Sequence, residues 1–402
     1  MRKVAVVGVG ATKFKARWIE KTYFELAFDA VKEALNMAGI GKDDVESVVY
    51  GIYNEFFQRQ FMPELFTHDY LGFTFVPATR VAAGGATGGA AVRTAFMEVA
   101  SGAHDVVAVV GLEKCTDCWD YDRATATPEV LRSIAYSIDM TYEYPLGAFA
   151  AAEYALPTVA HIEKFGGPTE EQMAMVSVKN HGNAMNNPLA QSGKEITVED
   201  VMNSRMICYP FKFYDNCLYT EGAAALILAS EDRAREITDK PVFITGVGSA
   251  TDMGFPGFKT GRKSNIWEFG STRVAGERAY RMAGIKNPRK ELDVVEIHDA
   301  FTAAELLSYE AFGFCEPGGG GRLIEEGVTW MDGELPVCPS GGLIGCGHAV
   351  GATGVMQTGE AVLQLRGEAD RRQVKNARKA LVQSIGGVAC AYTVAMVLER
   401  GE

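Results

Sequence analysis

The segment R-K-V-A-V-V-G-V-G-A-T-K-F at Arg2–Phe14 is the most informative part of the sequence for the fold, because it has a counterpart, K-P-V-F-I-T-G-V-G-S-A-T-D, at Lys240–Asp252. Both are β-rich runs that lead into Gly-Val-Gly, which predicts a strand ending in a turn at residues 8–10 and again at 246–248. The first turn is not expected to bind a dinucleotide, because Lys13 stands where G-x-G-x-x-G has its third glycine.

The similarity continues beyond the two strands. Each is followed by a helical stretch that closes on Met-Ala-Gly-Ile, at residues 37–40 in the first half and 282–285 in the second. Each tetrapeptide leads through a charged segment into a β-rich run, over 46–56 and 293–301. The sequence therefore predicts two copies of one unit.

Strands and helices alternate within each unit. We expect a helix over about Ala90–Ala100, a strand over Val106–Gly111, and further strands over Ala223–Ala229 and Cys390–Leu398. This alternation predicts an α/β protein in which helices cover the sheets.

Three parts are expected along the chain. Residues 1–118 with 220–239 would form the N-terminal unit, and residues 240–402 the C-terminal unit. The segment 119–219 is rich in Tyr, Met, Asn and Pro, and it is too long to be a linker. We expect it to be an inserted region that covers the active site.

The composition excludes several classes of function. The 402 residues carry a net charge of −12, which opposes non-specific binding to nucleic acid or to an anionic membrane surface. No apolar run approaches the roughly 20 residues of a membrane span. Eight cysteines without secretory features favour reduced thiols and a cytoplasmic protein. Only one C-x-x-C pair occurs, Cys115 with Cys118, so we expect no metal site.

Two glycine-rich segments are candidates for the active site. Tiny residues run from Ala82 to Ala91 and open a helix, which indicates either tight helix packing or an oxyanion site at the helix N-terminus. A second glycine-dense loop, Cys338–Gly354, contains His348 and opens another helix. His298 lies between a predicted strand and a helix, a position typical of site residues.

At these segments the sequence resembles the thiolase superfamily, in particular the archaeal and sterol-carrier-protein types. The resemblance covers essentially the whole chain and rests on the two-fold repeat and on motifs that include A-A-G-G-A-T-G-G-A-A at 82–91, H-D-A-F at 298–301 and G-H-A-V-G-A-T-G at 347–354. It implies a duplicated α/β unit in five layers (α/β/α/β/α) and a homodimer. The implied chemistry makes or breaks carbon–carbon bonds in acyl-CoA thioesters, with coenzyme A as co-substrate and no tightly bound cofactor.

The sequence departs from that family at its two catalytic thiols. Gly85 stands at the position of the nucleophilic cysteine, and the second, acid/base cysteine is replaced by Ser384 or Ala300, depending on the motif compared. A covalent acyl-enzyme therefore cannot form at residue 85, and the missing side chain would leave room for a bulky acyl group. Cys346 and Cys115 are the alternative nucleophiles that the sequence offers.

The remaining site residues still imply catalysis. His298 and His348 match the family positions that polarise a thioester or keto oxygen, and backbone N–H groups near Gly85 and Gly386 would form a second oxyanion hole. Two groups of relatives share these features in part. Steroid side-chain aldolases lack the nucleophile but typically carry tyrosines at the histidine positions, whereas the thiolase-like subunit of benzoylsuccinyl-CoA thiolase handles a bulky aromatic ketone.

We therefore expect retro-Claisen cleavage of a bulky 3-oxoacyl-CoA, such as benzoylsuccinyl-CoA, by CoA. The alternatives are retro-aldol cleavage of a 3-hydroxyacyl-CoA, or a catalytically inactive scaffold subunit. Both groups of relatives imply a small zinc-ribbon/OB-fold partner subunit. The loop 255–267 supplies Lys259, Arg262 and Lys263, which either bind the CoA nucleotide or form a solvated surface loop.

Overall fold

The computed structural model describes residues 1–118, 130, 134, 136–261 and 263–401. Its core is a nine-stranded sheet in the order β3-β2-β4-β7-β1-β8-β11-β10-β9. The strands are β1 (Val4–Ala11), β2 (Ser47–Gly51), β3 (Ala78–Val81), β4 (Val106–Glu113), β7 (Gly222–Ser230), β8 (Val242–Thr251), β9 (Val294–Glu296), β10 (Lys379–Gly386) and β11 (Tyr392–Arg400).

The strand order repeats on the two sides of the sheet. Counted outward from the centre, β1, β7, β4 and β2 on one side correspond to β8, β11, β10 and β9 on the other. In both halves the first two of these neighbours pair antiparallel, and the strand after the repeated Met-Ala-Gly-Ile pairs parallel with its neighbour. The halves join where β1 pairs with β8, with Ala5 opposite Phe243. The chain is thus a duplicated α/β unit.

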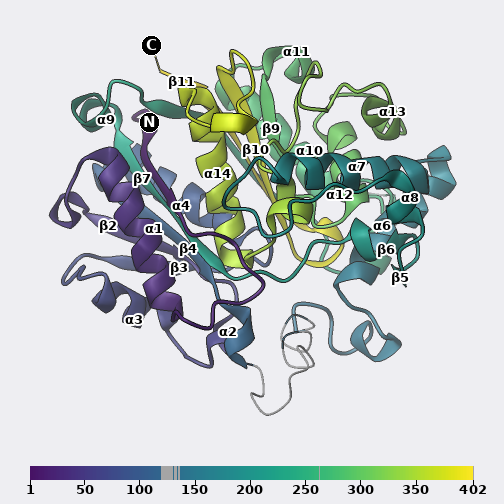
Figure 1. Cartoon of the computed structure of the whole chain (residues 1–402), viewed down its shortest axis with the longest axis horizontal. Coiled ribbons are helices and arrows are strands. Elements are labelled where there is room, and N and C mark those ends of the chain that lie inside the picture. Colours follow the sequence, from purple (N-terminus) through teal and green to yellow (C-terminus); the bar gives the residue numbers. More distant parts are fainter. Residues whose placement is uncertain (119–129, 131–133, 135, 262, 402) are drawn as a thin grey trace.

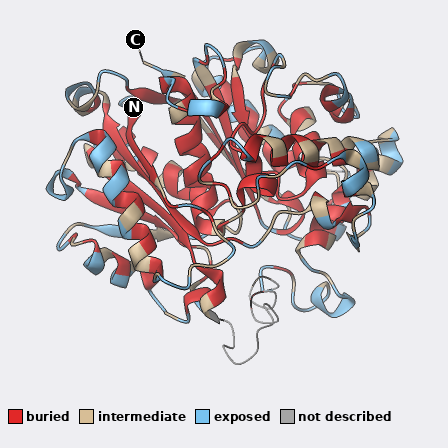
Figure 2. Cartoon of the chain, viewed as in Figure 1, coloured by how far each residue is buried: buried red, intermediate tan, exposed pale blue. Residues whose placement is uncertain are grey.

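Helices and sheet halves stack in five layers (Figure 1). Helix α1 (Tyr23–Ala38) covers the outer face of the first half, and α10 (Gly270–Ala283) with α12 (Thr302–Ala311) covers the outer face of the second. Between the halves lie α4 (Thr87–Ser101) and α14 (Val350–Arg366), which pack on residues of both. Alternate strand residues therefore face different helix layers, and Figure 2 shows the central helices and strands as almost wholly buried.

The Gly-Val-Gly stretches are not turns, contrary to the prediction from sequence. Gly8 and Gly10 lie inside β1, and Gly246 and Gly248 lie inside β8. A Cβ at Gly8 would stand 2.2 Å from the carbonyl oxygen of Ala34 in α1, and a Cβ at Gly246 would stand 2.3 Å from that of Ala279 in α10. The glycines are present because a helix backbone lies directly on each strand.

Other predicted elements occur with shifted ends. Helix α4 begins at Thr87 rather than about Ala90, and β4 continues to Glu113. Strand β11 begins at Tyr392 rather than Cys390, because Ala389 and Cys390 adopt left-handed φ angles of 45° and 58° that a strand cannot contain.

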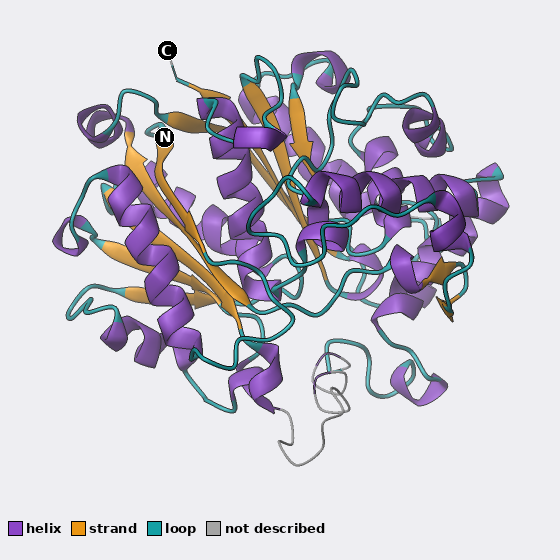
Figure 3. Ribbon diagram, viewed as in Figure 1, coloured by secondary structure: helices purple, strands orange, loops and turns teal. Residues whose placement is uncertain are grey.

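The middle of the chain contributes helices and a short hairpin beside the second half (Figure 3). These are α6 (Ala150–Phe165), α7 (Glu170–Ala184), α8 (Val198–Met202), β5 (Met206–Cys208) and β6 (Phe211–Lys212). The other α-helices among the described residues are α2 (Glu55–Gln58), α3 (Pro63–Tyr70), α9 (Glu231–Ile237), α11 (Pro288–Glu291) and α13 (Gly320–Glu325). No helix in the described ranges combines the length and the apolar character that crossing a bilayer requires.

Candidate active site

A cavity of about 660 Å³ lies where the two halves meet the middle segment. Gly85, His298, His348 and Gly386 all line it, so the structure brings together four predicted site residues that are up to 301 positions apart. Its walls are largely apolar and aromatic, and they include side chains from the middle segment: Ile138, Phe149, Tyr154, Ile207, Phe213 and Leu218.

The two histidines face each other in this cavity. Their ring centroids are 4.9 Å apart and the rings are perpendicular. Burial lowers the pKa of His348 to about 4, and burial together with His348 holds the pKa of His298 well below its usual range. Both imidazoles are therefore neutral at pH 7, and each has one N–H donor and one lone pair.

The direction of the Thr353 hydroxyl and the ring tautomer of His348 depend on each other. The Thr353 hydroxyl is 2.9 Å from His348 Nδ1 and 2.9 Å from the carbonyl oxygen of Ala349. The hydroxyl has one proton, so it donates either to the carbonyl, which makes Nδ1 the donor, or to Nδ1, which places the ring proton on Nε2. The second arrangement makes His348 Nε2 an oxyanion donor.

His298 is held differently. Its backbone N–H donates to Gln383 Oε1 at 3.3 Å, whereas its Nδ1 is buried and has no hydrogen-bond partner within the described residues. Its Nε2 lies 3.0 Å from the point that a Cβ on Gly85 would occupy. His298 therefore reaches the position where the family carries its nucleophile.

Backbone groups, not free volume, fill the place of the missing thiol. A Cβ at Gly85 would stand 2.4 Å from the carbonyl oxygen of Ile385, and a Cβ at Gly386 would stand 2.1 Å from that of Ala83. The expectation that the absent side chain leaves room for an acyl group is therefore wrong at the Cβ position. The loops around Gly85 and Gly386 instead pack backbone to backbone at the start of α4.

The two candidate positions of the second, acid/base thiol have different surroundings. Ala300 lines the cavity. Ser384 points between the central helices, since its Oγ is 2.6 Å and 2.5 Å from the places of a Cβ on Gly89 and Gly354, and this Oγ has no partner within the described residues.

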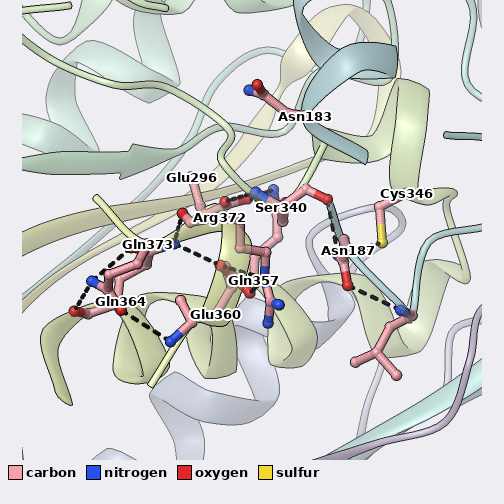
Figure 4. Close-up of polar contacts among 12 residues, drawn as sticks. Asn183, Asn187, Glu296, Ser340, Cys346, Gln357, Glu360, Gln364, Arg372 and Gln373 are labelled. Atoms are coloured by element: carbon pink, nitrogen blue, oxygen red, sulfur yellow. Dashed lines mark hydrogen bonds and ion pairs between the residues drawn. The ribbon is translucent and has the colours of Figure 1, made fainter. Parts of the chain in front are cut away.

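Two cysteines are placed differently from what the sequence suggested. Cys346 is fully buried beside Asn187, whose Nδ2 is 3.7 Å from its Sγ (Figure 4), and it is not among the residues that line the cavity. Burial raises the pKa of its thiol far above the usual range. Cys217 does line the cavity, and burial, with the charge of Asp299, raises its pKa to about 12. No motif surrounds Cys217 in the sequence.

A buried ionic network supports the histidine loops. Asp299 Oδ1 accepts the backbone N–H of Leu343 at 2.6 Å, and Asn180 Nδ2 donates to Asp299 and to Glu305, at 2.7 Å each. Asp299 and Glu305 lie close enough to Cys338 to suggest a metal site, but Lys179 Nζ is 3.0 Å from Glu305 and supplies the positive charge. The cluster is an internal ion pair that ties the His298 segment to the loop before His348.

The cationic residues predicted to bind CoA differ in their exposure and contacts. Lys259 is 5% exposed; its Nζ donates to the Ala389 carbonyl at 2.9 Å and pairs with Asp252 at 3.1 Å. Lys263 is exposed, and Arg262 lies outside the described residues. An exposed arginine that the sequence did not single out, Arg205, lines the cavity.

Comparison with known proteins assigns the family. Residues 4–207 match the family described as "Thiolase, N-terminal domain", and residues 259–400 match "Thiolase C-terminal domain-like". The chain belongs to the thiolase family, and its fold is the thiolase fold.

Named relatives cover nearly the whole chain. An acetyl-CoA acetyltransferase of Methanothermobacter thermautotrophicus is 40% identical over 389 residues, 96% of this chain and 97% of that protein. The benzoylsuccinyl-CoA thiolase subunit BbsB of Thauera aromatica is 30% identical over 97% of this chain and 96% of that protein. Among solved structures, the Ltp2-ChsH2(DUF35) aldolase has a TM-score of 0.83 and 26% identity, covering 99% of this chain and 97% of that one.

Proposed function

We propose that this protein cleaves or forms a carbon–carbon bond in a bulky 3-oxoacyl-CoA, with CoA as co-substrate and without a cysteine acyl-enzyme. The observation that carries the proposal is the pair of neutral histidines facing each other in an apolar cavity whose nucleophile position is Gly85. The similarity to BbsB supports an aromatic acyl group such as benzoylsuccinyl-CoA.

The site residues suit a direct attack by CoA. The thiolate sulfur of CoA forms a bond to the keto carbon, whose oxygen becomes an oxyanion near His298 and His348. Collapse of this intermediate breaks the bond to the α-carbon, and the released acyl-CoA enolate takes up a proton. Each fixed donor to such an oxyanion contributes roughly 10²–10³ in rate.

Removal of the His348 imidazole tests the proposal. Incubation with CoA and aryl 3-oxoacyl-CoAs, with products identified by mass spectrometry, should give two shorter thioesters for the wild type. We expect His348→Ala and His298→Ala each to lose roughly 10²–10³ of this activity. His104→Ala is the matched control, because His104 is not among the residues that line the cavity. Full activity in His348→Ala would overturn the proposal.

A retro-aldol reaction is the second candidate, because the similarity to the Ltp2-ChsH2(DUF35) aldolase extends over 99% of this chain. Retro-aldol cleavage of a 3-hydroxyacyl-CoA gives a carbonyl compound and an acyl-CoA and needs no free CoA. The two reactions are therefore distinguished by whether product formation requires added CoA. Failure with both substrate classes, in the presence of any co-purifying subunit, would favour an inactive scaffold.

The partners belong to the same proposal. The relatives' names support a second subunit, since one is a thiolase subunit and the other an aldolase with a DUF35 component. The homodimer and the zinc-ribbon/OB-fold character of that subunit stay predictions from the family resemblance. Arg205 lines the cavity and Lys263 is exposed, so we propose these two described cations as contacts for the anionic CoA. Affinity purification from the native source, followed by mass spectrometry, tests for the second subunit.

A further inference from the structure

We propose that Glu153 is the catalytic acid/base of this site and does the proton transfer that the family assigns to a thiol. This inference rests on the proposed function, since it names the group that moves the proton in that reaction. Glu153 lies in the first turn of α6 and lines the same cavity as Gly85, His298 and His348.

The placement of this carboxyl is unusual for a structural residue. Glu153 is 4% exposed, and its Oε2 is buried without a hydrogen-bond partner within the described residues. An unpaired buried carboxylate is costly, so evolution rarely keeps one without a function. Among the described residues that line the cavity, Glu153 is the one carboxyl group.

The surroundings suit proton exchange near neutral pH. Burial and, to a lesser extent, Glu143 raise the pKa of Glu153 to about 7, against the opposing charge of Lys259. Lys259 itself is held by Asp252 and by the Ala389 carbonyl, and no ion pair joins it to Glu153 within the described residues.

The other titratable groups of the cavity are poorly suited to this role. The thiol of Cys217 remains protonated because its pKa is raised to about 12. Burial raises the pKa of each of the three cavity phenols, Tyr53, Tyr154 and Tyr219, so they too stay protonated. His298 and His348 are neutral, and the proposed reaction uses each of them, in the tautomer that carries its N–H toward the cavity, as a donor to the developing oxyanion.

Glu153 alone can carry out both proton transfers of the proposed reaction. Its carboxylate takes the proton of the CoA thiol, and the resulting thiolate forms the carbon–sulfur bond at the keto carbon. When the bond between the keto carbon and the α-carbon breaks, the electron pair stays on the α-carbon as an enolate. The Glu153 carboxylic acid then returns its proton to that carbon, so the residue ends in its starting state.

Solvent exchange at the α-carbon tests this role separately from cleavage. The wild type, incubated with a saturated acyl-CoA in deuterium oxide, should exchange α-protons, as read by mass spectrometry. We expect Glu153→Gln to lower both exchange and turnover by roughly 10²–10⁴ while calorimetry shows unchanged binding of the acyl-CoA. Glu153→Asp, one methylene shorter, should retain partial exchange and serves if the Gln variant does not fold. Glu163→Gln, exposed on the same helix, is the matched control.

The outcomes separate the two proposals. Equal exchange by wild type and Glu153→Gln overturns the role of Glu153 even if the protein is a thiolase. Absence of exchange in the wild type overturns it as well. Exchange that depends on Glu153, without cleavage of any 3-oxoacyl-CoA, supports the acid/base role while the proposed function fails.

Discussion

Gly85 shows how strongly one position is constrained by its neighbours. From sequence alone, restoring a cysteine there should leave folding intact. The structure changes this expectation, because a Cβ would lie 2.4 Å from the Ile385 carbonyl oxygen and 3.0 Å from the His298 ring. Backbone cannot yield as a flexible side chain does, so the loop carrying Gly386 would have to move.

We expect Gly85→Cys to lower the melting temperature by several degrees and not to yield an efficient acyl-enzyme. Scanning calorimetry and intact-protein mass spectrometry after incubation with acyl-CoA measure the two effects. Gly254→Cys is the control, because a Cβ there meets nothing within 4 Å. A stable Gly85→Cys variant that acylates readily would contradict the packing argument.

Lys259 is expected to position the Gly386 loop rather than to bind CoA. It holds the carbonyl of Ala389, where two successive residues have left-handed φ angles. Such a conformation costs free energy and persists only when the surroundings impose it. We expect Lys259→Met to lower kcat at least tenfold with little change in KM, and Lys263→Met to leave kcat unchanged. Steady-state kinetics distinguishes the two, since a lost phosphate contact would raise KM alone.

Some site residues were predictable individually and others were not. His298 and His348 stand in glycine-rich or strand-end motifs, and such motifs are local in the sequence. Glu153 and Cys217 have no such motif, and they reach the cavity only because the middle segment folds over it. The cavity position of Arg205 and the contact of Lys259 with the Ala389 carbonyl escaped prediction for the same reason, since both join segments far apart in the chain.

At the scale of elements, the glycines of β1 and β8 set the distance between strand and helix. Their repetition identified the two units correctly, but the Gly-Val-Gly stretches were wrongly predicted to be turns. The sequence pattern alone does not distinguish a glycine that permits a turn from a glycine that allows a helix backbone to approach the strand closely. Only the contact with α1 or α10 decides between them.

We expect Gly246→Ala to destabilise the protein by about 1–3 kcal/mol or more, because the added methyl would stand 2.3 Å from the Ala279 carbonyl and push α10 off β8. Gly8→Ala should act similarly on α1. Gly182→Ala, in α7 with open space around the new methyl, should be neutral or slightly stabilising. Urea denaturation of the three variants provides the comparison, and a fully stable Gly246→Ala would contradict close packing.

At the scale of the whole molecule, Glu113 joins the first half to the central helix of the second. Its Oε2 accepts the backbone N–H groups of Tyr53 at 3.2 Å and of Gly351, at the start of α14, at 3.1 Å. Gln58 Nε2 is 3.5 Å from Oε1, and the Gln58 Oε1 has no partner within the described residues. A protonated Glu113 donates to that oxygen if the Gln58 amide is flipped.

Burial raises the pKa of Glu113 from 4.5 to about 8. Between these values the folded protein keeps a proton that the unfolded chain has lost, so this residue makes stability fall as pH rises through that window. Glu113→Gln mimics the protonated form. We expect it to match the wild type near pH 5 and to exceed it above pH 8. Urea midpoints measured across this range check the sign, and a parallel dependence in both proteins would contradict it.

The duplicated α/β fold, the family and the lack of a thiol at position 85 can be recognised in the amino-acid sequence, because repeats and motifs are patterns of neighbouring residues. The surroundings of Gly85, the burial of Lys259, and the cavity that Glu153 and Cys217 share with His298 and His348 become visible only in the folded chain. This is because segments far apart in the chain form the cavity and set its electrostatics. Their packing sets burial, and burial sets the protonation of each group.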